Sequence, residues 1–426
     1  QKGETMEIPY GSTQMQFSLP DTWNVDWIAP PLLGEAKSAP AIIEAALDDE
    51  LGVSLGSIAA GAKSAAIAIN DKTRPVPNEL LLPPLLARLE RAGIAPANIT
   101  LLIATGSHLP MKSREFSLIL PKEILERYPV VSHDCDDESR LTYCGRTRSG
   151  TEVWANSLYQ SADLRIVCGN LEPHHFMGYS GGVKTAAIGL TGRKTINQNH
   201  HFLLDPASKI GTYETNPTRM DVEEIGELMG VHYALNAIMS PDKILRSAVA
   251  GQPKAIMKPG IRLANTYTMA PVRKHYDLVI ASAGGYPKDI NLYQAQKGLT
   301  NAASITRDGG KTILVSECRD GVGSQSYLDF VKDLSSYDDV LDKFASLGFQ
   351  VGPHKAVQFG LIAKRVRVYL VSTLPLEITN RLLLTGYSDI DSAVANCMTS
   401  SEQSTIRNVA IMPFATTTVP DLEGSL

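Results

Sequence analysis

The stretch LRIVCGNLEPHHFMGYSGGVK, residues 164–184, decides the fold class of this chain. It opens with an apolar run, turns into a loop of small and polar residues, and leads after Lys184 into a helix-forming segment. A near-continuous apolar run is typical of a strand buried on both faces of a parallel sheet. The same pattern returns at residues 64–77, 99–110, 276–299, 311–321 and 365–375. The sequence therefore predicts an α/β fold with mostly parallel sheets flanked by helices.

The length of the chain predicts two domains, because 426 residues are too many for one simple core. A connector near residue 270 precedes the fourth apolar run and suggests a boundary there. We expect a cofactor-binding and catalytic N-terminal domain over residues 1–270 and a C-terminal α/β domain over residues 271–407. The last segment, residues 408–426, is expected to rejoin the first domain. We place the active site in the interdomain cleft.

The composition argues against several classes of protein. A formal net charge of −5 is unlike a nucleic-acid-binding protein, which would usually carry a basic face. No apolar run reaches the roughly 18–20 residues that a membrane-spanning helix needs. The five cysteines are widely spaced and form no C-x-x-C pair, which argues against a disulfide scaffold or a zinc knuckle. We therefore predict a cytoplasmic protein that binds neither nucleic acid nor membranes.

Polar residues gather where the apolar runs end. Residues 71–74 (DKTR), His108, His174 and residues 286–297 each follow one of these runs. In open α/β sheets, ligands bind beyond the carboxyl ends of the strands. These positions are therefore the candidate site.

A glycine-rich turn, GYSGG, precedes Lys184. Gly178, Gly181 and Gly182 permit tight backbone geometry, and Ser180 lies among them. Backbone N–H groups in such a turn, at the start of a helix, can bind an anion such as a phosphate. A lysine beside a phosphate site could be desolvated and could attack a carbonyl or thioacid carbon. The alternatives are a purely structural turn and a solvated lysine.

Three histidines are candidates for chemistry. His108 and His174 both follow apolar runs, and histidine suits proton transfer near neutral pH. Two bases on opposite faces of a carbon atom are what stereochemical inversion requires, whereas the alternative is a pair of structural histidines. His200 could bind a metal, but one histidine is too few for a site built by the protein alone. A metal there would need most of its ligands from a cofactor.

Other polar side chains could hold an acidic substrate. Arg74 lies in a loop stiffened by Pro75 and Pro77, and its guanidinium could bind a carboxylate or phosphate through two nitrogens. Gln294 and Lys297 are three residues apart, hence on one helical face, and could hold a small carboxylate. The alternative for this pair is a solvated helix face.

Five motifs, in this order, make the chain similar to a known family: DKTRPVP, ATGSHLP, GNLEPHHFMGYSGGVKT, INQNH and YPKDINLYQAQKG. Together they resemble the nickel-pincer-nucleotide-dependent lactate racemase family. The resemblance implies a nickel-carrying cofactor of the pyridinium-3,5-bisthiocarboxylic acid mononucleotide type, linked to Lys184.

The resemblance also implies a role for each candidate residue. His200 would be the nickel ligand, and His108 and His174 would be the catalytic bases. The substrate would be held by Arg74, Gln294 and Lys297. The cofactor would be contacted, besides Lys184, by Asp71, Ser180, Gly181 and Gly182.

The expected function is a racemase or epimerase that inverts C2 of lactate or a related 2-hydroxycarboxylate. The reaction would proceed by proton-coupled hydride transfer through a 2-keto acid. Cofactor-biosynthesis proteins would load the cofactor, and the oligomeric state is left open. One alternative is a nicotinamide-dependent dehydrogenase, although a G-x-G-x-x-G turn after a strand is missing. The other is a non-catalytic nucleotide-cofactor-binding protein, in which two histidines would be idle.

Overall fold

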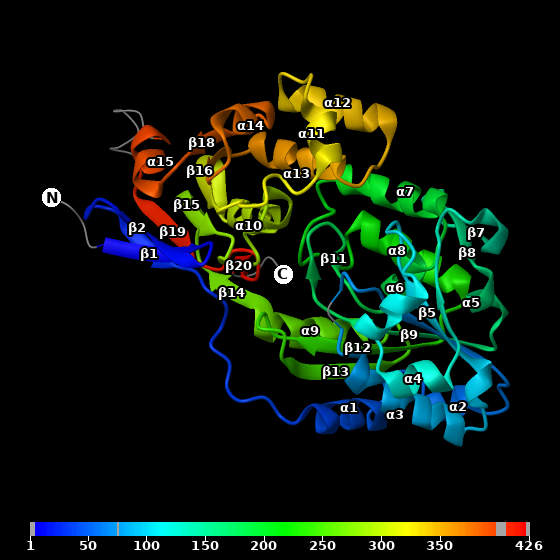
Figure 1. Ribbon diagram of the computed structural model, residues 1–426. Helices are drawn as coiled ribbons and strands as arrows, with labels where there is room; N and C mark the ends of the chain where they lie inside the picture. Colours follow the sequence, from blue (N-terminus) through cyan, green and yellow to red (C-terminus); the bar gives the residue numbers. More distant parts are fainter. Residues whose placement is uncertain (1–4, 75, 398–405, 423–426) are drawn as a thin grey trace. The chain divides into compact units, whose positions relative to one another are not determined.

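A computed structural model describes residues 5–74, 76–397 and 406–422. The chain forms two compact units, which we call the central unit (Leu33–Tyr267) and the terminal unit (Gln1–Leu32 with Thr268–Leu426). Figure 1 traces both along the sequence. Within the described ranges, every helix is too short or too polar to cross a membrane.

The central unit is built on a six-stranded sheet in which five neighbouring strands are parallel. Only the edge strand β13 runs antiparallel to its neighbour. In spatial order the strands are β13 (Leu245–Gly251), β12 (Tyr233–Met239), β9 (Leu164–Asn170), β4 (Ala65–Asn70), β5 (Ile99–Ala104) and β6 (Val130–Ser132). The predicted parallel architecture is confirmed.

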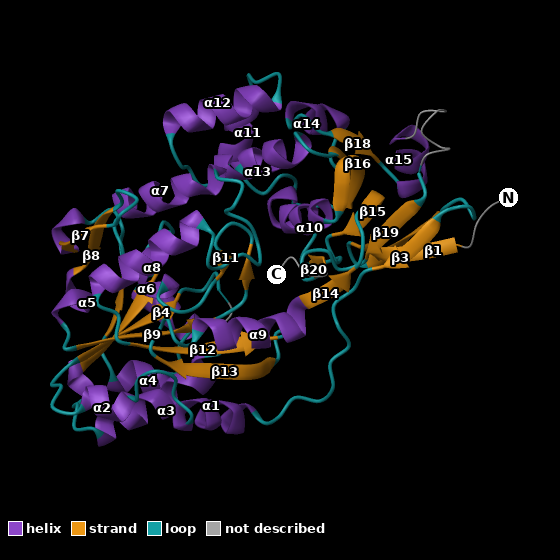
Figure 2. Ribbon diagram, turned by 180° about the vertical axis from the view of Figure 1, so that it is seen from behind, coloured by secondary structure: helices purple, strands orange, loops and turns teal. Residues whose placement is uncertain are grey.

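Helices cover both faces of this sheet, with α1 and α3 on one side and α5 and α6 on the other (Figure 2). The helices of the central unit are α1 (Ala39–Asp48), α2 (Leu55–Ala59), α3 (Asn78–Arg91), α4 (Lys122–Arg127), α5 (Ser157–Ser161), α6 (Lys184–Gly189), α7 (Arg193–His201), α8 (Pro217–Met229) and α9 (Met257–Thr268). Two small antiparallel pairs complete it: β7 (Leu141–Arg146) with β8 (Glu152–Asn156), and β10 (Pro173–His174) with β11 (Gly178–Tyr179).

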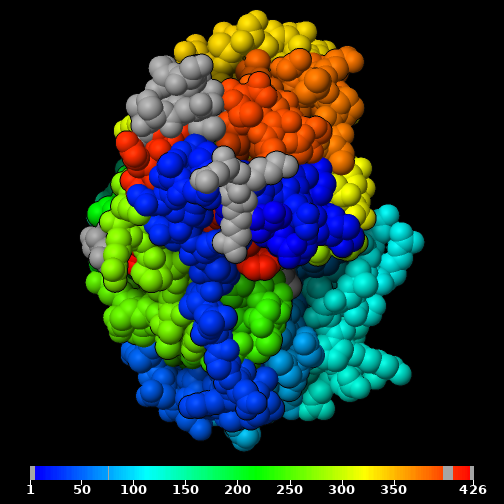
Figure 3. Space-filling view, turned by 90° about the vertical axis from the view of Figure 1, so that its left-hand side faces the viewer, coloured from blue at the N-terminus to red at the C-terminus, as the bar shows by residue number. Residues whose placement is uncertain are grey.

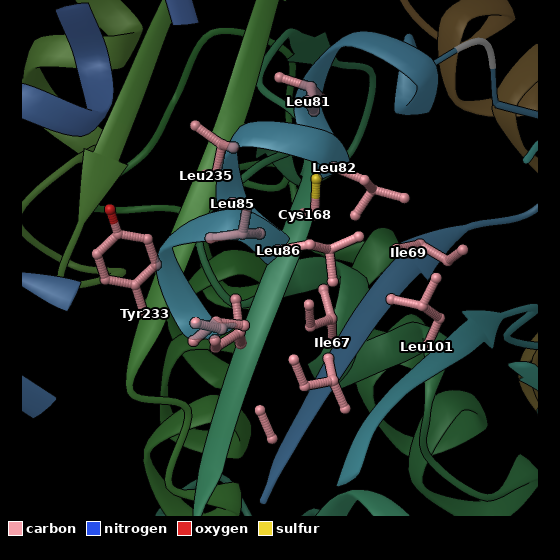
Figure 4. Close-up of a cluster of buried hydrophobic side chains, with 14 of the residues drawn as sticks. Ile67, Ile69, Leu81, Leu82, Leu85, Leu86, Leu101, Cys168, Tyr233 and Leu235 are labelled. Atoms are coloured by element: carbon pink, nitrogen blue, oxygen red, sulfur yellow. The ribbon is translucent and has the colours of Figure 1, made fainter. Parts of the chain in front are cut away.

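One face of the central sheet packs against α3 to form the core shown in Figure 4. Side chains of Ile67, Ile69 and Leu101 point from the strands toward Leu82 and Leu86 of the helix, and all five are buried. Burying a leucine or isoleucine side chain contributes roughly 1.5–3 kcal/mol relative to exposure. This core holds β4 and β5 in place, and therefore fixes where the loops after these strands begin.

The terminal unit contains a second six-stranded sheet, in which all strands are parallel. In spatial order they are β18 (Thr385–Tyr387), β17 (Arg367–Val371), β16 (Thr306–Val315), β15 (Tyr276–Ser282), β19 (Asn408–Met412) and β3 (Asn24–Trp27). The hairpin β1 (Thr5–Tyr10) with β2 (Thr13–Ser18) and the parallel pair β14 (Met269–Val272) with β20 (Val419–Leu422) join it. Its helices are α10 (Leu292–Ser304), α11 (Gln325–Val331), α12 (Tyr337–Leu347), α13 (Pro353–Ala363), α14 (Leu376–Arg381) and α15 (Ile390–Cys397).

Both ends of the chain belong to the terminal unit, which corrects two expectations. Residues 1–32 do not belong to the N-terminal domain, because β3 pairs with β19 and the backbone N–H of Asn24 donates to the carbonyl of Arg407 over 2.8 Å. The described part of the last segment, residues 408–422, does not rejoin the first domain, because β19 lies between β15 and β3 and β20 pairs with β14. Figure 3 shows the N-terminal residues in blue beside C-terminal ones in red. The physical reason is that an apolar strand such as β19 needs a partner on each side.

The glycine-rich turn before α6 is held from within by a buried arginine of α8. Arg219 is fully buried, and its Nη1 and Nη2 each donate over 3.1 Å, to the carbonyls of Tyr179 and Gly181. Its charge is balanced by Glu223, whose Oε1 lies 2.6 Å from Nη2. The amide of Gly182 in turn donates to Oδ1 of the buried Asn236 over 2.7 Å. The turn is therefore tied to α8 and β12.

Glycine is required in this turn. Gly178, Gly181 and Gly182 have φ values of +72°, +86° and +57°, a region that side-chain-bearing residues rarely adopt. A Cβ atom at Gly178 would lie 1.8 Å from the carbonyl oxygen of Thr212, a contact that nothing could relieve without moving the backbone. The predicted tight geometry is confirmed.

His133, in the loop after β6, is another buried polar residue of the central unit. Its Nε2 donates to the carbonyl of Thr191 over 3.0 Å, and its Nδ1 accepts from Nδ2 of Asn156 over 3.1 Å. This pattern requires the neutral ring, which has one donor and one acceptor. Burial lowers the pKa of His133 below its usual 6.5.

We expect Arg219→Ala to lower the free energy of unfolding by about 3–5 kcal/mol, because it leaves the carbonyls of Tyr179 and Gly181 without their donor and removes the cationic partner of the largely buried Glu223. Chemical denaturation followed by circular dichroism measures it. Arg148→Ala is the matched control, since the exposed Arg148 pairs with Glu224 of the same helix. It should cost less than about 1 kcal/mol. Equal losses in the two variants would contradict the assignment.

The stability of the central unit should fall in mild acid because of His133. The unfolded chain takes up a proton near pH 6.5, whereas the folded chain does so only at lower pH. Lowering the pH below 6.5 therefore favours unfolding, by at most about 1.4 kcal/mol per pH unit from this residue. His133→Gln should flatten the measured slope, and His201→Gln, at an exposed histidine, should leave it unchanged. Identical slopes in all three proteins would refute this explanation.

Candidate active site

Asp71 and His108 meet at the carboxyl ends of β4 and β5. Oδ2 of Asp71 lies 2.8 Å from Nδ1 of His108. Oδ1 of Asp71 accepts from the backbone N–H of Thr73 over 3.1 Å and from its hydroxyl over 2.7 Å. Asp71 is 4% exposed, whereas the His108 side chain is 41% exposed. A buried carboxylate therefore holds a histidine that reaches solvent.

The charge of Asp71 determines what His108 can do. Burial raises the pKa of Asp71, but hydrogen bonds from His108 and Thr73 outweigh it and bring the pKa below its usual value. An ionised carboxylate can only accept, so Nδ1 of His108 is the donor and Nε2 carries the lone pair. A histidine whose Nδ1–H is hydrogen-bonded to a carboxylate is the arrangement used for general-base catalysis on several folds. The predicted contact of Asp71 with a cofactor stays a prediction; its bond to His108 was not foreseen.

The second candidate base lies in a tight turn after β9. The rings of His174 and His175 are stacked, with centroids 4.6 Å apart and planes 12° apart. Nδ1 of His174 accepts from the backbone N–H of Met177 over 3.3 Å. The ring of Phe176 makes T-shaped contacts with the rings of both histidines and with that of His200, whose centroid lies 5.2 Å from its own. The turn is thus packed against the last turn of α7.

His200 has the protonation state that a metal ligand needs. Burial and then the positive charge of Lys184 lower the pKa of His200 to about 3. The ring is therefore neutral at any ordinary pH, as metal binding through a nitrogen lone pair requires. Its Nδ1 lies 3.2 Å from Oδ1 of Asn199, the residue before it.

Lys184, the first residue of α6, has an unusual amine. Its pKa is lowered from 10.5 to about 7, first by burial and then by the positive charges of Arg74 and Arg219, against the opposing effect of Glu172. A large fraction of the side chain is therefore uncharged at neutral pH and can act as a nucleophile. The charge of Arg74 acts on the pKa of Lys184, and the charge of Lys184 acts on the pKa of His200. These three side chains therefore lie near one another.

The polar groups of the glycine-rich turn are largely used to shape it. The backbone N–H of Ser180 donates to the carbonyl of Glu172 over 2.8 Å, and its hydroxyl donates to that of Asn170 over 3.1 Å. The amide of Gly182 is bound by Asn236. Ser180 and Gly182 therefore have clear structural roles, and the predicted cofactor contacts of Ser180, Gly181 and Gly182 stay predictions.

Gln294 and Lys297 belong to the terminal unit. Both are exposed on α10, opposite a face that includes the buried Ala295 and Leu299. The helix begins at a capped turn, because Oδ1 of Asn291 accepts from the backbone N–H of Gln294 over 2.9 Å. The shared exposed face is as expected, and substrate binding by this pair stays a prediction.

Sequence reasoning missed three polar residues beneath the site: Asn199, Arg219 and Asp221. All three are fully or almost fully buried. Arg219 and Asp221 share the buried face of α8 with Val222 and Ile225. Charged residues at positions of an apolar helical stripe were the signal that could have revealed them.

Comparisons with known proteins identify the family. A model of the lactate racemase N-terminal domain matches residues 10–211, and one of the C-terminal domain matches residues 272–415. A lactate racemase of Thermoanaerobacterium thermosaccharolyticum is 32% identical over 349 residues, which cover 80% of this chain and 81% of that protein. A lactate racemase of Lactiplantibacillus plantarum is 32% identical over 305 residues, 71% of each chain.

Solved structures agree. The lactate racemase apoprotein of T. thermosaccharolyticum superposes with a TM-score of 0.88 at 27% identity, covering 98% of this chain and 100% of that one. A protein of Thermotoga maritima, covering 92% of this chain and 100% of its own, has a TM-score of 0.62 at 16% identity and shares the fold alone. A dehydrogenase and a non-catalytic binding protein are therefore set aside. With both domain models matched and two relatives aligned over most of their length, the chain belongs to the lactate racemase family and is an isomerase.

Proposed function

We propose that this enzyme inverts C2 of a 2-hydroxycarboxylate, lactate or a close relative. The observation that carries the proposal is the Asp71–His108 pair, a base oriented by a buried carboxylate at the ligand-binding edge of an α/β sheet. Two relatives that share about a third of their residues with this chain are lactate racemases. The expected substrate is therefore a small anion with a hydroxyl group beside its carboxylate.

The residues present fit a nickel-pincer nucleotide. Among the described residues, the group of three ligands that could hold a metal is Asp134, Cys135 and Asp136, and His200 is outside it. His200 would thus be a lone imidazole ligand, which suits a cofactor that brings its own soft donors. Lys184 would supply the amine that holds this cofactor. When bound, such a group supplies a reversible hydride acceptor for the substrate C2. We also propose that the protein is cytoplasmic and that cofactor-biosynthesis proteins load the nickel-pincer nucleotide there.

The chain's own residues would manage the proton and the orientation. The C2–H bond of a hydroxycarboxylate is a very poor acid, so removal of hydride with loss of the hydroxyl proton is the easier route to a planar 2-keto acid. Nε2 of His108 would accept that proton, and Asp71 would stabilise the resulting imidazolium. On the other face, a protonated His174 would donate a proton to the carbonyl oxygen as hydride returns to C2. Return of hydride to that face inverts the centre.

The carboxylate of the substrate needs a cationic partner. Arg74 is exposed at the end of β4, in the neighbourhood of Lys184, and a guanidinium can bind a carboxylate with two parallel hydrogen bonds. With the carboxylate held in this way, the keto acid could rotate only its C2 carbonyl group, so that the opposite face of C2 is presented for the return of hydride. Gln294 and Lys297 are proposed as further ligands of the same carboxylate.

The direct test is incubation of cofactor-loaded enzyme with single enantiomers of several 2-hydroxy acids. We expect inversion of at least one, measured by chiral chromatography. Asp71→Asn should lower kcat by about 10²–10⁴-fold, because the carboxylate that orients and charges the base is lost.

The control for this experiment is Asp48→Asn, which removes an exposed carboxylate of the same unit and should leave kcat unchanged. Absence of inversion for every acid tried, with the cofactor shown to be loaded, would sink the proposal. Full activity in Asp71→Asn would refute the assigned role of the pair.

The amine of Lys184 should be reactive near neutrality in the apoprotein. We expect its labelling by an amine-specific reagent, followed by peptide mass spectrometry, to rise as pH increases through about 7. In the urea-unfolded chain the same lysine should respond only near its usual 10.5, which is the internal control. In loaded enzyme the label should be blocked. Lys184→Ala carrying the same covalent mass increment as wild type would contradict the proposed link.

A further inference from the structure

We propose that Asn199 and Asp221 are positioning residues that orient the imidazole of His200 so that Nε2, and not Nδ1, carries the lone pair for the metal. This inference rests on the proposed role of His200 as nickel ligand. It is carried by a chain of hydrogen bonds in the described part of the central unit.

The orientation of the Asn199 amide is determined by its surroundings. Asn199 is fully buried, and its Nδ2 lies 3.0 Å from the backbone carbonyl oxygen of Thr218 and 2.9 Å from Oδ2 of Asp221. A backbone carbonyl can only accept a hydrogen bond. Turning the amide over would set its oxygen against that carbonyl, so the NH₂ group must face α8. The amide oxygen therefore faces the other way, toward His200.

The position of the ring proton follows from this orientation. Oδ1 of Asn199 lies 3.2 Å from Nδ1 of His200 and can only accept. Nδ1 must therefore carry the hydrogen. The backbone of Ile196, one helical turn earlier, also interacts favourably with the protonated ring. A neutral imidazole has a single N–H, so with the hydrogen on Nδ1 the lone pair is on Nε2.

Asp221 keeps Asn199 in place. Its Oδ1 accepts from the hydroxyl of Thr147 over 2.6 Å, and its Oδ2 accepts from that of Thr151 over 2.9 Å as well as from Asn199. All of these groups are buried. The carboxylate thus joins the turn between β7 and β8, helix α8 and helix α7. A buried network in which each member has its partners is rigid, and it leaves the ring one orientation.

Such support has a measurable value for a metal ligand. A ligating histidine commonly donates its other N–H to an acceptor, and loss of that acceptor typically costs about 10–100-fold in metal affinity. Here the acceptor is the amide of Asn199 rather than a carboxylate. Asp221 does not contact the ring and acts on it through its hydrogen bond to Asn199.

The first measurement is the tautomer of His200 in the full-length apoprotein. Long-range proton–nitrogen NMR spectra of histidine-labelled protein distinguish the two tautomers, and His200→Ala assigns the signals. We expect the Nδ1–H form in wild type. Asn199→Leu keeps the branched shape of the side chain but removes the acceptor, so the Nε2–H form should appear beside the Nδ1–H form. A wild-type ring in the Nε2–H form would overturn the inference, whether or not any variant folds.

The second measurement is nickel affinity, by competition with a chelator on protein isolated with its cofactor. Asn199→Leu should bind nickel about 10–100-fold more weakly than wild type. Gln198→Leu is the matched control, because Gln198 lies on the same helix but accepts from the backbone N–H of Glu152 over 2.8 Å. It should match wild type in both measurements. Unchanged tautomer and affinity in Asn199→Leu would refute the positioning role.

The two proposals fail in different ways. Undiminished nickel affinity in His200→Ala would refute the assignment of His200 as ligand, and with it the link of this network to the metal. In that case the tautomer measurement would still decide whether Asn199 sets the ring. Loss of nickel in His200→Ala, with no effect of Asn199→Leu, would keep the proposed function and overturn only the inference.

Discussion

The candidate site depends on one buried charge, the guanidinium of Arg219. It bonds to the carbonyls of Tyr179 and Gly181, and Glu223 balances it. An arginine without partners in a protein interior is very costly, so these carbonyls cannot move away while α8 is folded. A turn of small residues, which would be flexible in isolation, is thereby given one conformation. Lys184 lies two residues after this turn, at the start of α6, and takes its place from it.

The same cation also acts on the chemistry. Burial is the main reason for the low pKa of Lys184, and the charges of Arg74 and Arg219 add to it. Lys184 in turn helps to keep His200 neutral. An amine that is largely uncharged near neutral pH and an imidazole that stays neutral therefore arise together from one crowded, positively charged neighbourhood. Helix α8 contributes to both, through Arg219 on the glycine-rich turn and through Asp221 on Asn199.

The fold and the site could be predicted to different extents. Apolar runs revealed the strands that carry Asp71, His108 and His174, because burial on both faces leaves a local pattern. The stacking of His174 on His175 could not be foreseen, since neighbours on an extended strand point to opposite sides. A tight turn at this point brings both rings to one side. The pairing of β3 with β19 joins residues from opposite ends of the chain. A local sequence pattern cannot predict which distant strand becomes the partner, or in which register.

The sequence by itself determined the parallel α/β architecture, the loops that carry the candidate residues and, through five motifs, the family. Each of these depends on residues close together in the chain. Only the tertiary structure decided which unit the two ends join, and that Asp71 supports His108. It also revealed that Arg219, Asn199 and Asp221 lie beneath the site. The physical reason is that buried polar groups must find partners, and those partners come from distant segments that only folding brings together.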